Sequence, residues 1–208
     1  ILKQSGVQLI PNAEVTGFEK NGKQITGVKT ATQTYDADVA VIATGSWSRE
    51  IASMVGLNLP LMPGRGYSVT LEDSPFKLNY PAVLQEGRVA ITPMDGNKIR
   101  FGGTMEITST QTPPRMKRVA GILEAVERYL PDFKIPTPST NDIWYGYRPC
   151  SADGLPYIGR VKGNVIIATG HAMVGLSLGA GTGQLVAELA NGQPASVDLK
   201  PYDPERFA

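Results

Sequence analysis

The sequence predicts an α/β domain that is interrupted by an antiparallel sheet carrying one helix. Two apolar runs predict strands, and a helical pattern follows each of them. Residues 38–45 are typical of a strand buried on both faces of a parallel sheet, and residues 165–169 form a second apolar strand. Between these runs, residues 65–106 alternate between apolar and polar side chains, which is typical of antiparallel strands. We therefore expect one domain from residues 1–59 and 150–208, and a second domain, residues 60–149, inserted into it.

The first residues predict the end of a helix and a hairpin. Lys3 followed by Gly6 is typical of a last helical turn with a glycine C-cap, and a strand over residues 7–10 is expected next. A chain that begins at a helix end favours a fragment of a longer protein. Asn21-Gly22 then predicts a hairpin between strands at residues 14–20 and 23–30, with a third short strand that ends at Tyr35.

The inserted domain contains strands, one helix and a returning strand. The helix is expected to begin after Pro113-Pro114, and Pro131 closes it. The returning strand covers residues 142–148, and Pro149 is expected to end it. The earlier strands are expected at residues 66–71, 82–85, 88–93 and 98–104. The apolar stripe of the helix consists of Met116, Val119, Leu123, Val126 and Leu130.

Composition excludes several classes of protein. Lys+Arg 20 against Asp+Glu 19 leaves no surplus of positive charge for a nucleic-acid partner. The single cysteine, Cys150, excludes an internal disulfide and a cysteine metal cluster, so no metal site is expected and a cytoplasmic location is favoured. No apolar run approaches the ~20 residues of a membrane span. Peripheral contact with the inner face of the cytoplasmic membrane stays open.

Two features of residues 144–192 are suited to holding negative charge. The strand 165–169 runs through a loop, residues 170–175, into a helix from about Leu176 to Ala190, and the backbone N–H groups of Met173 to Leu176 are expected at the helix start. Arg148 ends a strand rich in Trp and Tyr, where a planar guanidinium can bind a carboxylate through two hydrogen bonds.

Several motifs occur in order over nearly the whole chain. They are Ala43-Thr44-Gly45, Gly66-Tyr67-Ser68, Gly102-Gly103-Thr104-Met105-Glu106, Trp144-x-Gly146-x-Arg148-Pro149, Asp153-Gly154-x-Pro156-x-Ile158-Gly159, and Thr169-Gly170-His171 leading to Gly181-x-Gly183. In this order they resemble the motifs of the D-amino-acid oxidase (DAO) family of flavoproteins, and most of all those of its bacterial D-amino-acid dehydrogenases.

The resemblance implies an FAD-dependent enzyme that oxidises a D-amino acid. Hydride would pass from Cα to flavin N5, the imino acid would hydrolyse to a 2-oxo acid and ammonia, and electrons would leave to a quinone or to oxygen. Residues 1–59 and 150–208 would form an incomplete, Rossmann-like FAD-binding domain, and residues 60–149 the substrate domain. No Gly-x-Gly-x-x-Gly turn for the FAD pyrophosphate follows a strand here, which favours the fragment hypothesis.

The resemblance also assigns the site residues. Arg148 would bind the substrate carboxylate, with Tyr67 and Tyr147 lining the pocket or packing in the sheet. The expected cofactor-binding residues are Val15, Thr44, Gly45, Gly170, His171, Met173, Val174, Gly175 and Leu176. Met173 stands where some family members carry a polar or basic residue that touches substrate, so the choice of amino acid stays open.

Other roles for the remaining residues stay open beside these. His171, the only histidine, could act as a general base, although the backbone of its loop is the better candidate for flavin contact. Cys150 could attach flavin covalently, and packing as a small filler is the alternative. Gly179, Gly181 and Gly183 could allow close packing of the helix against a strand or the cofactor.

Two alternatives to the D-amino-acid dehydrogenase hypothesis remain. One is a related amine oxidoreductase acting on glycine, sarcosine or a hydroxyproline. The other is an inactive domain fragment. We expect the 208-residue chain alone to retain no FAD, to have no dehydrogenase activity and to self-associate through exposed apolar surface.

Overall fold

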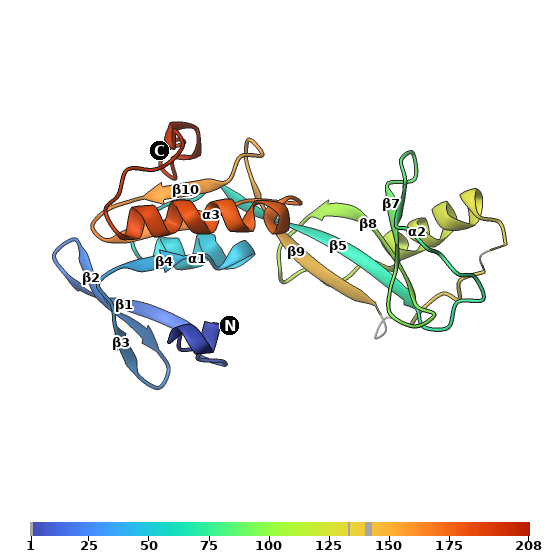
Figure 1. Ribbon diagram of the computed structural model, residues 1–208, viewed down its shortest axis with the longest axis horizontal. Helices are drawn as coiled ribbons and strands as arrows, with labels where there is room; N and C mark the ends of the chain where they lie inside the picture. The colour runs from blue at the N-terminus through green and yellow to red at the C-terminus, as the bar shows by residue number, and fades with distance from the viewer. Residues whose placement is uncertain (1, 133, 140–142) are drawn as a thin grey trace. The chain divides into compact units, whose positions relative to one another are not determined.

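The computed structural model describes residues 2–132, 134–139 and 143–208 (Figure 1). Contacts within the chain divide it into two units, one formed by Ile1–Leu61 with Pro149–Ala208 and the other by Met62–Arg148. Each unit has its own hydrophobic core. The assignment of the first unit to FAD and of the second to substrate stays a proposal.

A three-stranded sheet in the order β10-β11-β4 forms the centre of the first unit. Strand β11 (Val165–Thr169) pairs in parallel with β4 (Ala40–Ile42) and antiparallel with β10 (Tyr157–Arg160), so the two predicted apolar strands are neighbours, as expected. Ala40 and Ile42 are buried, but Val41 is 43% exposed. The prediction that this strand is buried on both faces is therefore wrong for the described part of the chain, because β4 is at the sheet edge and one of its faces is open.

A second sheet of the first unit consists of β1 (Val15–Asn21), β2 (Gln24–Thr30) and β3 (Thr34–Asp36). Asn21 pairs with Gln24, so the tight turn is Gly22-Lys23, one residue later than predicted, with Gly22 at φ 61°. The buried side chain of Asn164 joins the two sheets. Its Oδ1 accepts a hydrogen bond from the Ile25 N–H, and its Nδ2 donates one to the Ile25 carbonyl, each at 2.7 Å.

The chain begins with a short 3-10 helix, η1 (Leu2–Ser5), that ends at Gly6 as predicted. The Val7 amide donates to the Leu2 carbonyl and the Gly6 amide to the Lys3 carbonyl, with Gly6 at φ 80°. These two bonds define a Schellman cap. The strand predicted over residues 7–10 is wrong: these residues are exposed and pair with no strand among the described residues.

The helices of the first unit follow its parallel strands. A 3-10 turn, η2 (Gly45–Trp47), and helix α1 (Ser48–Ser53) come after β4, and α3 (Gly175–Ala190) comes after β11. Helix α3 packs along β10 and β11 (Figure 1) and buries only Leu185 fully. A last 3-10 turn, η4 (Lys200–Tyr202), lies near β10.

A five-stranded sheet in the order β6-β7-β8-β5-β9 dominates the second unit. Strand β9 continues past Pro149 to Ser151, so the prediction that Pro149 ends the strand is wrong. The physical reason is that β9 lies at the sheet edge, where a residue without an N–H is tolerated. The predicted first residue of this strand, Asp142, is outside the described residues. The bounds are β5 (Leu61–Leu71), β6 (Ala82–Leu84), β7 (Val89–Pro93), β8 (Ile99–Ile107) and β9 (Trp144–Ser151).

Helix α2 (Met116–Tyr129) covers one face of this sheet. The predicted stripe is confirmed: Val119, Leu123 and Val126 are buried, and Met116 and Leu130 are partly buried against the same core. Full burial of one such side chain stabilises the fold by roughly 1.5–3 kcal/mol. The sheet contributes Tyr67, Val69, Val89, Ile91, Ile99 and Phe101 to the core.

Candidate functional site

The loop between β11 and α3 adopts a constrained backbone. Gly170 has φ 85° and Ala172 has φ 47°, a left-handed conformation that a residue with a side chain rarely adopts. The Ala172 amide donates to the Pro149 carbonyl at 2.9 Å, and a β-bridge joins Cys150 to His171. The end of β9 therefore holds this loop in place within the first unit.

The amides at the start of α3 are not all available to a ligand. The Val174 amide donates to the His171 carbonyl at 3.0 Å, so this one of the N–H groups expected at the helix start is already engaged within the loop. No side chain caps the helix and no acidic residue lies in its first turn. Leu176 is 98% exposed and Met173 is 69% exposed. The positive end of the helix dipole is therefore exposed, and it would stabilise a group that becomes negatively charged when it accepts electrons.

Thr44 and Gly45 lie at the carboxyl end of β4, beside the end of its parallel neighbour β11. The Thr169 hydroxyl donates to the Gly45 carbonyl at 3.2 Å and accepts from Ser48 at 2.9 Å. Thr44 in turn donates to Ser48 at 3.2 Å. The structure therefore brings three predicted cofactor residues, Thr44, Gly45 and Gly170, to the ends of two parallel strands, where open α/β sheets bind their ligands.

The side chain of His171 contacts α3, the helix that follows its loop. Its Nε2 lies 2.9 Å from the Thr182 hydroxyl, and burial lowers the pKa of the imidazole below its ordinary value. The ring is therefore neutral at pH 7 and orients the loop by its contact with α3. This geometry favours a positioning role over a general base.

The remaining predictions for the first unit have mixed outcomes. A Cβ built at Gly179, Gly181 or Gly183 meets no heavy atom within 4 Å. The hypothesis that these glycines pack α3 closely against a strand is therefore wrong for the described residues, and their face of the helix is open. Val15 is half-buried at the start of β1, in the other sheet of the unit.

Arg148 lies across the backbone of Gly66 in the second unit. A Cβ built at Gly66 would overlap the Arg148 guanidinium, so only glycine leaves room for it. A Cβ at Gly146 would likewise lie 2.7 Å from the Trp144 ring. Because side chains alternate along a strand, Trp144, Gly146 and Arg148 share one face of β9. This face presents a guanidinium and an indole above two glycines.

Tyr67 and Tyr147 do not join Arg148 on that face. Tyr67 is 2% exposed in the core, and its hydroxyl donates to Glu106 at 2.9 Å. Tyr147 alternates with Arg148 along β9, and its hydroxyl donates to the Thr110 carbonyl at 3.0 Å. Both hydroxyls are engaged within the second unit. The assignment of these tyrosines to the substrate pocket stays a prediction.

The second unit contains a buried ion pair that was not predicted from the sequence. Arg65 is 0% exposed; it donates to Glu106 at 2.9 Å and also to the carbonyls of Thr112 and Pro113. Burial alone raises the pKa of Glu106, but hydrogen bonds from Arg65 and Tyr67 outweigh it, so that pKa lies below its usual value. Burial likewise lowers the pKa of Arg65, but the bond to Glu106 and the interactions with Tyr67 and Tyr147 together outweigh it, so that pKa lies above its usual value.

The sequence marks each of the two charged residues as unusual, but it does not show that they pair with each other. Arg65 interrupts an apolar strand pattern, as does Glu106, and lone charges in buried strands are usually paired. Matching them requires the register of β5 and β8, in which Arg65 lies opposite Glu106. A bulge between Arg65 and Tyr67 shifts that register, and the sequence gives no sign of it.

None of the groups of His, Cys, Asp and Glu in residues 2–132, 134–139 and 143–208 could hold a metal ion. Over the same ranges, every helix is too short or too polar to span a membrane.

The ends of the parallel strands in the first unit lie where open α/β sheets bind their ligands, and Arg148 in the second unit has the planar guanidinium that suits a carboxylate. The chain belongs to the FAD dependent oxidoreductase (DAO) family, which it matches over residues 1–189. The family is FAD-dependent, as the motifs indicated.

Named relatives agree with this family. The chain is 32% identical over 206 residues to a D-amino-acid oxidase of Bradyrhizobium diazoefficiens, and 31% identical over 206 residues to a D-amino acid dehydrogenase of the same organism. Each alignment covers 98% of this chain and 48% of the relative. The chain therefore spans about half the length of the curated relatives it matches.

A solved structure is similar as well. The crystal structure of glycine oxidase from Geobacillus kaustophilus superposes with a TM-score of 0.80 at 27% identity, covering 93% of this chain and 52% of that one. The predicted fold class, α/β combined with an inserted antiparallel sheet, is confirmed by this similarity and by the family match.

Proposed function

We propose that this chain supplies the substrate-binding sheet and the flavin-facing loop of an FAD-dependent D-amino-acid dehydrogenase. The observation that carries the proposal is the Arg148 guanidinium, which lies over Gly66 on a sheet face beside Trp144. A planar guanidinium can bind an α-carboxylate through two charge-assisted hydrogen bonds. The D-amino-acid oxidase and dehydrogenase relatives support the same chemistry.

The residues of the first unit fit the isoalloxazine end of FAD. Gly45 has φ 59° and open space where a Cβ would be, so a planar ring can approach its backbone. The uncapped start of α3 places a partial positive charge near the loop 170–174, where it would stabilise negative charge on a reduced ring. The sequence contains no Gly-x-Gly-x-x-Gly turn to hold the pyrophosphate. The residues proposed here to contact FAD are therefore those at its isoalloxazine end.

The chain's own residues would act by orientation. Bound FAD would supply the acceptor for the hydride that leaves the substrate Cα. Arg148 would hold the carboxylate and so fix which Cα–H is presented, and the amides at the start of α3 would provide preorganised positive charge. The substrate would lose two electrons and two protons in all, and water would hydrolyse the imino acid to a 2-oxo acid and ammonia. No side-chain general base is required if the amine is neutral.

The test uses the full-length protein that carries this chain, purified with FAD. We expect Arg148→Ala to raise KM about a hundredfold or more, because the loss of two charge-assisted hydrogen bonds costs on the order of 3 kcal/mol. FAD content should not change. Arg128→Ala, at the exposed end of α2, is the control and should leave KM unaltered. An Arg148 variant with parental kcat/KM would refute the proposal.

The same protein separates the alternative activities. Dye reduction and oxygen uptake, measured side by side with D-alanine, distinguish a dehydrogenase from an oxidase. Glycine, sarcosine and hydroxyproline as substrates test the related amine oxidoreductases, among which glycine oxidase is supported by the structural similarity. Turnover of glycine but of no D-amino acid would overturn the substrate assignment. The 208-residue chain alone is expected to remain colourless and inactive after incubation with FAD and desalting.

A further inference from the structure

We propose that Trp144 is a specificity-determining residue whose indole favours D-amino acids with large apolar side chains. The inference deepens the proposed function and rests on it, because it takes the substrate carboxylate to be bound by Arg148. Both residues belong to strand β9 of the second unit. Trp144 is 63% exposed, whereas tryptophan side chains are highly buried on average, so this indole is available to a ligand.

The indole of Trp144 lies over the backbone of Gly146. A Cβ built at Gly146 would be 2.7 Å from Cη2, 3.2 Å from Cζ2 and 3.4 Å from Cζ3 of the indole. These atoms belong to the six-membered ring, so any residue other than glycine at this position would displace the ring. Gly146 lies between Trp144 and Arg148 on one face of the strand. The ring is therefore folded toward the arginine.

The indole and the guanidinium are about one amino acid apart. Gly146 and Arg148 are separated by about 7 Å along the strand, since a strand rises ~3.3 Å per residue. The guanidinium lies over Gly66 of the neighbouring strand β5, where a built Cβ would be 2.7 Å from its Cζ. An α-carboxylate bound to this guanidinium would leave the substrate side chain within reach of the ring. The methyl group of D-alanine is too short to cover the ring, but the side chain of D-leucine or D-phenylalanine would cover part of it.

The sheet face that carries the indole has small side chains near the arginine. Ser68 follows Gly66 at a spacing of two and therefore shares this face. Ser68 pairs with Gly102, which pairs with Ala90. Ala90 is exposed, and α2 packs against the opposite face of the sheet. A substrate side chain on this face would therefore find its largest apolar contact on the indole.

Arg100 is a competing group on this face, because a cation there would favour an acidic substrate side chain. It pairs with Thr70 across β5 and β8, and its Nε donates to the Thr70 hydroxyl at 3.4 Å. Thr70 is four residues from Gly66, which is about 13 Å along the strand. That separation exceeds the length of a substrate side chain whose carboxylate is held over Gly66. Arg100 is therefore too distant to select the side chain.

An exposed indole favours an apolar ligand for two physical reasons. A leucyl or phenylalanyl side chain laid on the ring removes apolar surface of both partners from water. A phenyl ring also gains from offset stacking or edge-to-face contact with an indole. Both effects strengthen the binding of the larger substrates and are nearly absent for D-alanine, so they change the ratio of kcat/KM between substrates.

The test uses the full-length protein that carries this chain, purified with FAD. We expect kcat/KM for D-leucine and D-phenylalanine to exceed that for D-alanine by about tenfold or more, the range that added methylene groups supply in an apolar site. Trp144→Ala should bring this ratio close to one and leave kcat/KM for D-alanine within about threefold of the parent value. Tyr80→Ala, which removes an 81% exposed aromatic ring of the same unit, is the matched control and should keep the parental ratio.

Further measurements separate side-chain recognition from a structural role. Competitive inhibition compares hydrocinnamate with propionate, which bind without reacting. The parent protein should bind hydrocinnamate about tenfold more tightly, and Trp144→Ala should bind both alike. Gly146→Ala keeps the tryptophan but displaces its ring, so it should lower the preference for D-leucine even if Trp144→Ala does not fold. Trp144→Phe retains an aromatic ring and should restore part of the preference.

The outcomes distinguish failure of this inference from failure of the function on which it rests. A parent protein that oxidises D-alanine as efficiently as the larger substrates would overturn the inference and leave the proposed function intact. A preference for D-glutamate would also overturn it and would assign selection to Arg100. Equal losses for all substrates in Trp144→Ala would show a structural residue, which contradicts the inference. Turnover of no D-amino acid would overturn the proposed function and the inference together.

Discussion

Two regions of the molecule differ in how far their polar groups are hydrogen-bonded. One is the buried cluster around Arg65 in the second unit, and the other is the start of α3 with the loop before it in the first unit. Arg65, Glu106 and Tyr67 bond one another in the core, and almost every donor of Arg65 has a partner. At the start of α3, the helix is uncapped, Leu176 is 98% exposed and three glycines face open space. The first arrangement supports a sheet, and the second leaves surface for another group to cover.

This difference indicates which residues carry stability and which carry binding. A buried charge that loses its partner is costly, so the Arg65–Glu106 pair has to be intact for the sheet beneath Arg148 to form. The three glycines of α3 lower the stability of the helix, and no close packing against other described residues requires them. Breaking the buried pair should therefore destabilise the fold, whereas replacing a glycine of α3 by alanine should stabilise it.

The largest effect is expected at the buried pair. Glu106→Gln removes the charge that compensates Arg65, and we expect a loss of about 3 kcal/mol in the free energy of unfolding. Glu72→Gln, which breaks the exposed pair between Lys98 and Glu72, is the control and should cost less than about 1 kcal/mol. Urea titrations of the parent and both variants measure these values. Similar small losses for both would show that the cluster is not a stability element.

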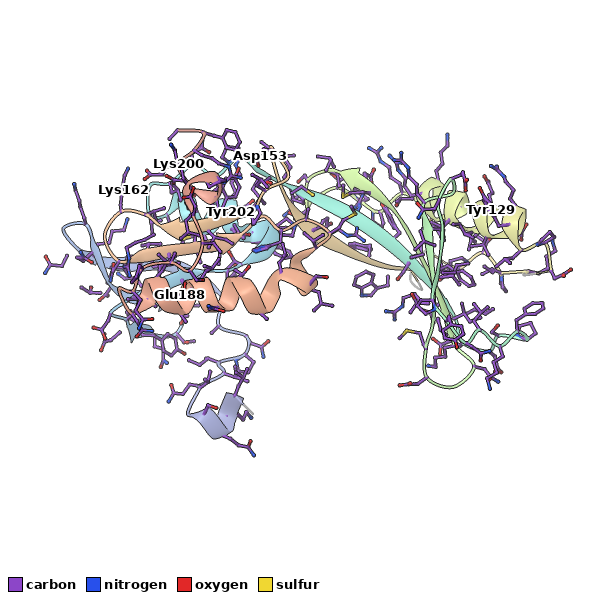
Figure 2. The ribbon with its side chains drawn as sticks, turned by 45° about the horizontal axis from the view of Figure 1, so that its top comes forward. Tyr129, Asp153, Lys162, Glu188, Lys200 and Tyr202 are labelled. Atoms are coloured by element: carbon purple, nitrogen blue, oxygen red, sulfur yellow. The ribbon has the colours of Figure 1, made fainter. Side chains whose placement is uncertain are left out.

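A smaller, pH-dependent effect is expected in the first unit. Asp153 lies on the loop before β10 (Figure 2), and Arg206 bonds both of its carboxylate oxygens, at 2.8 and 2.9 Å. The hydrogen bonds from Arg206 lower the pKa of Asp153 from 3.8 to about 2, although burial opposes them. Because folding depresses this pKa, its stabilisation is present above about pH 4 and is lost as the pH falls through about 2.

The variant Asp153→Asn tests this effect. We expect it to lower the free energy of unfolding by roughly 1–2 kcal/mol at pH 7, after allowance for partial solvent exposure, and by progressively less between pH 4 and pH 2. Asp36→Asn, on the exposed β3, is the control and should show no such pH dependence. Denaturant titrations at pH 7, 4 and 3 are sufficient. A difference between parent and Asp153→Asn that stays constant with pH would exclude the proposed linkage.

Two glycines of the first unit should respond to alanine in opposite directions, and the smallest effect of all is expected at Gly183. Gly170→Ala should destabilise by roughly 1–3 kcal/mol, because φ is 85° and the new Cβ would lie 3.0 Å from the Tyr157 ring. Gly183→Ala should stabilise the chain by up to about 1 kcal/mol, since its Cβ meets nothing and alanine favours the helix. Thermal unfolding measures both. Destabilisation by Gly183→Ala would indicate that this face is packed in solution.

Much of the fold could be predicted because its signals are local. The apolar stripe of α2 repeats at helical spacing, and Gly6 and Gly22 mark a helix end and a turn. The pairing of β4 with β11 followed from two apolar runs, each leading into a helix. The strand predicted over residues 7–10 failed because strand formation requires a partner, which no local pattern reveals.

The site was predictable only in part, for the same physical reason. The loop after β11 and the arginine at the end of a Tyr-rich strand have local signatures, and motifs of known relatives reinforced them. The face to which Tyr67 points depends on the bulge beside Arg65, and the engagement of the Val174 amide depends on how the loop turns. These details follow from tertiary contacts, not from residue type or spacing.

The most direct test of the proposed function asks whether Arg148 recognises a carboxylate. The full-length protein that carries this chain would be assayed with D-alanine and with D-alaninamide, which lacks the carboxylate charge. We expect the parent protein to prefer D-alanine by about a hundredfold in kcat/KM, the equivalent of two charge-assisted hydrogen bonds, and Arg148→Ala to show almost no preference. An Arg148→Ala protein that still discriminates between the two substrates as strongly as the parent would contradict the assignment of this arginine to the substrate.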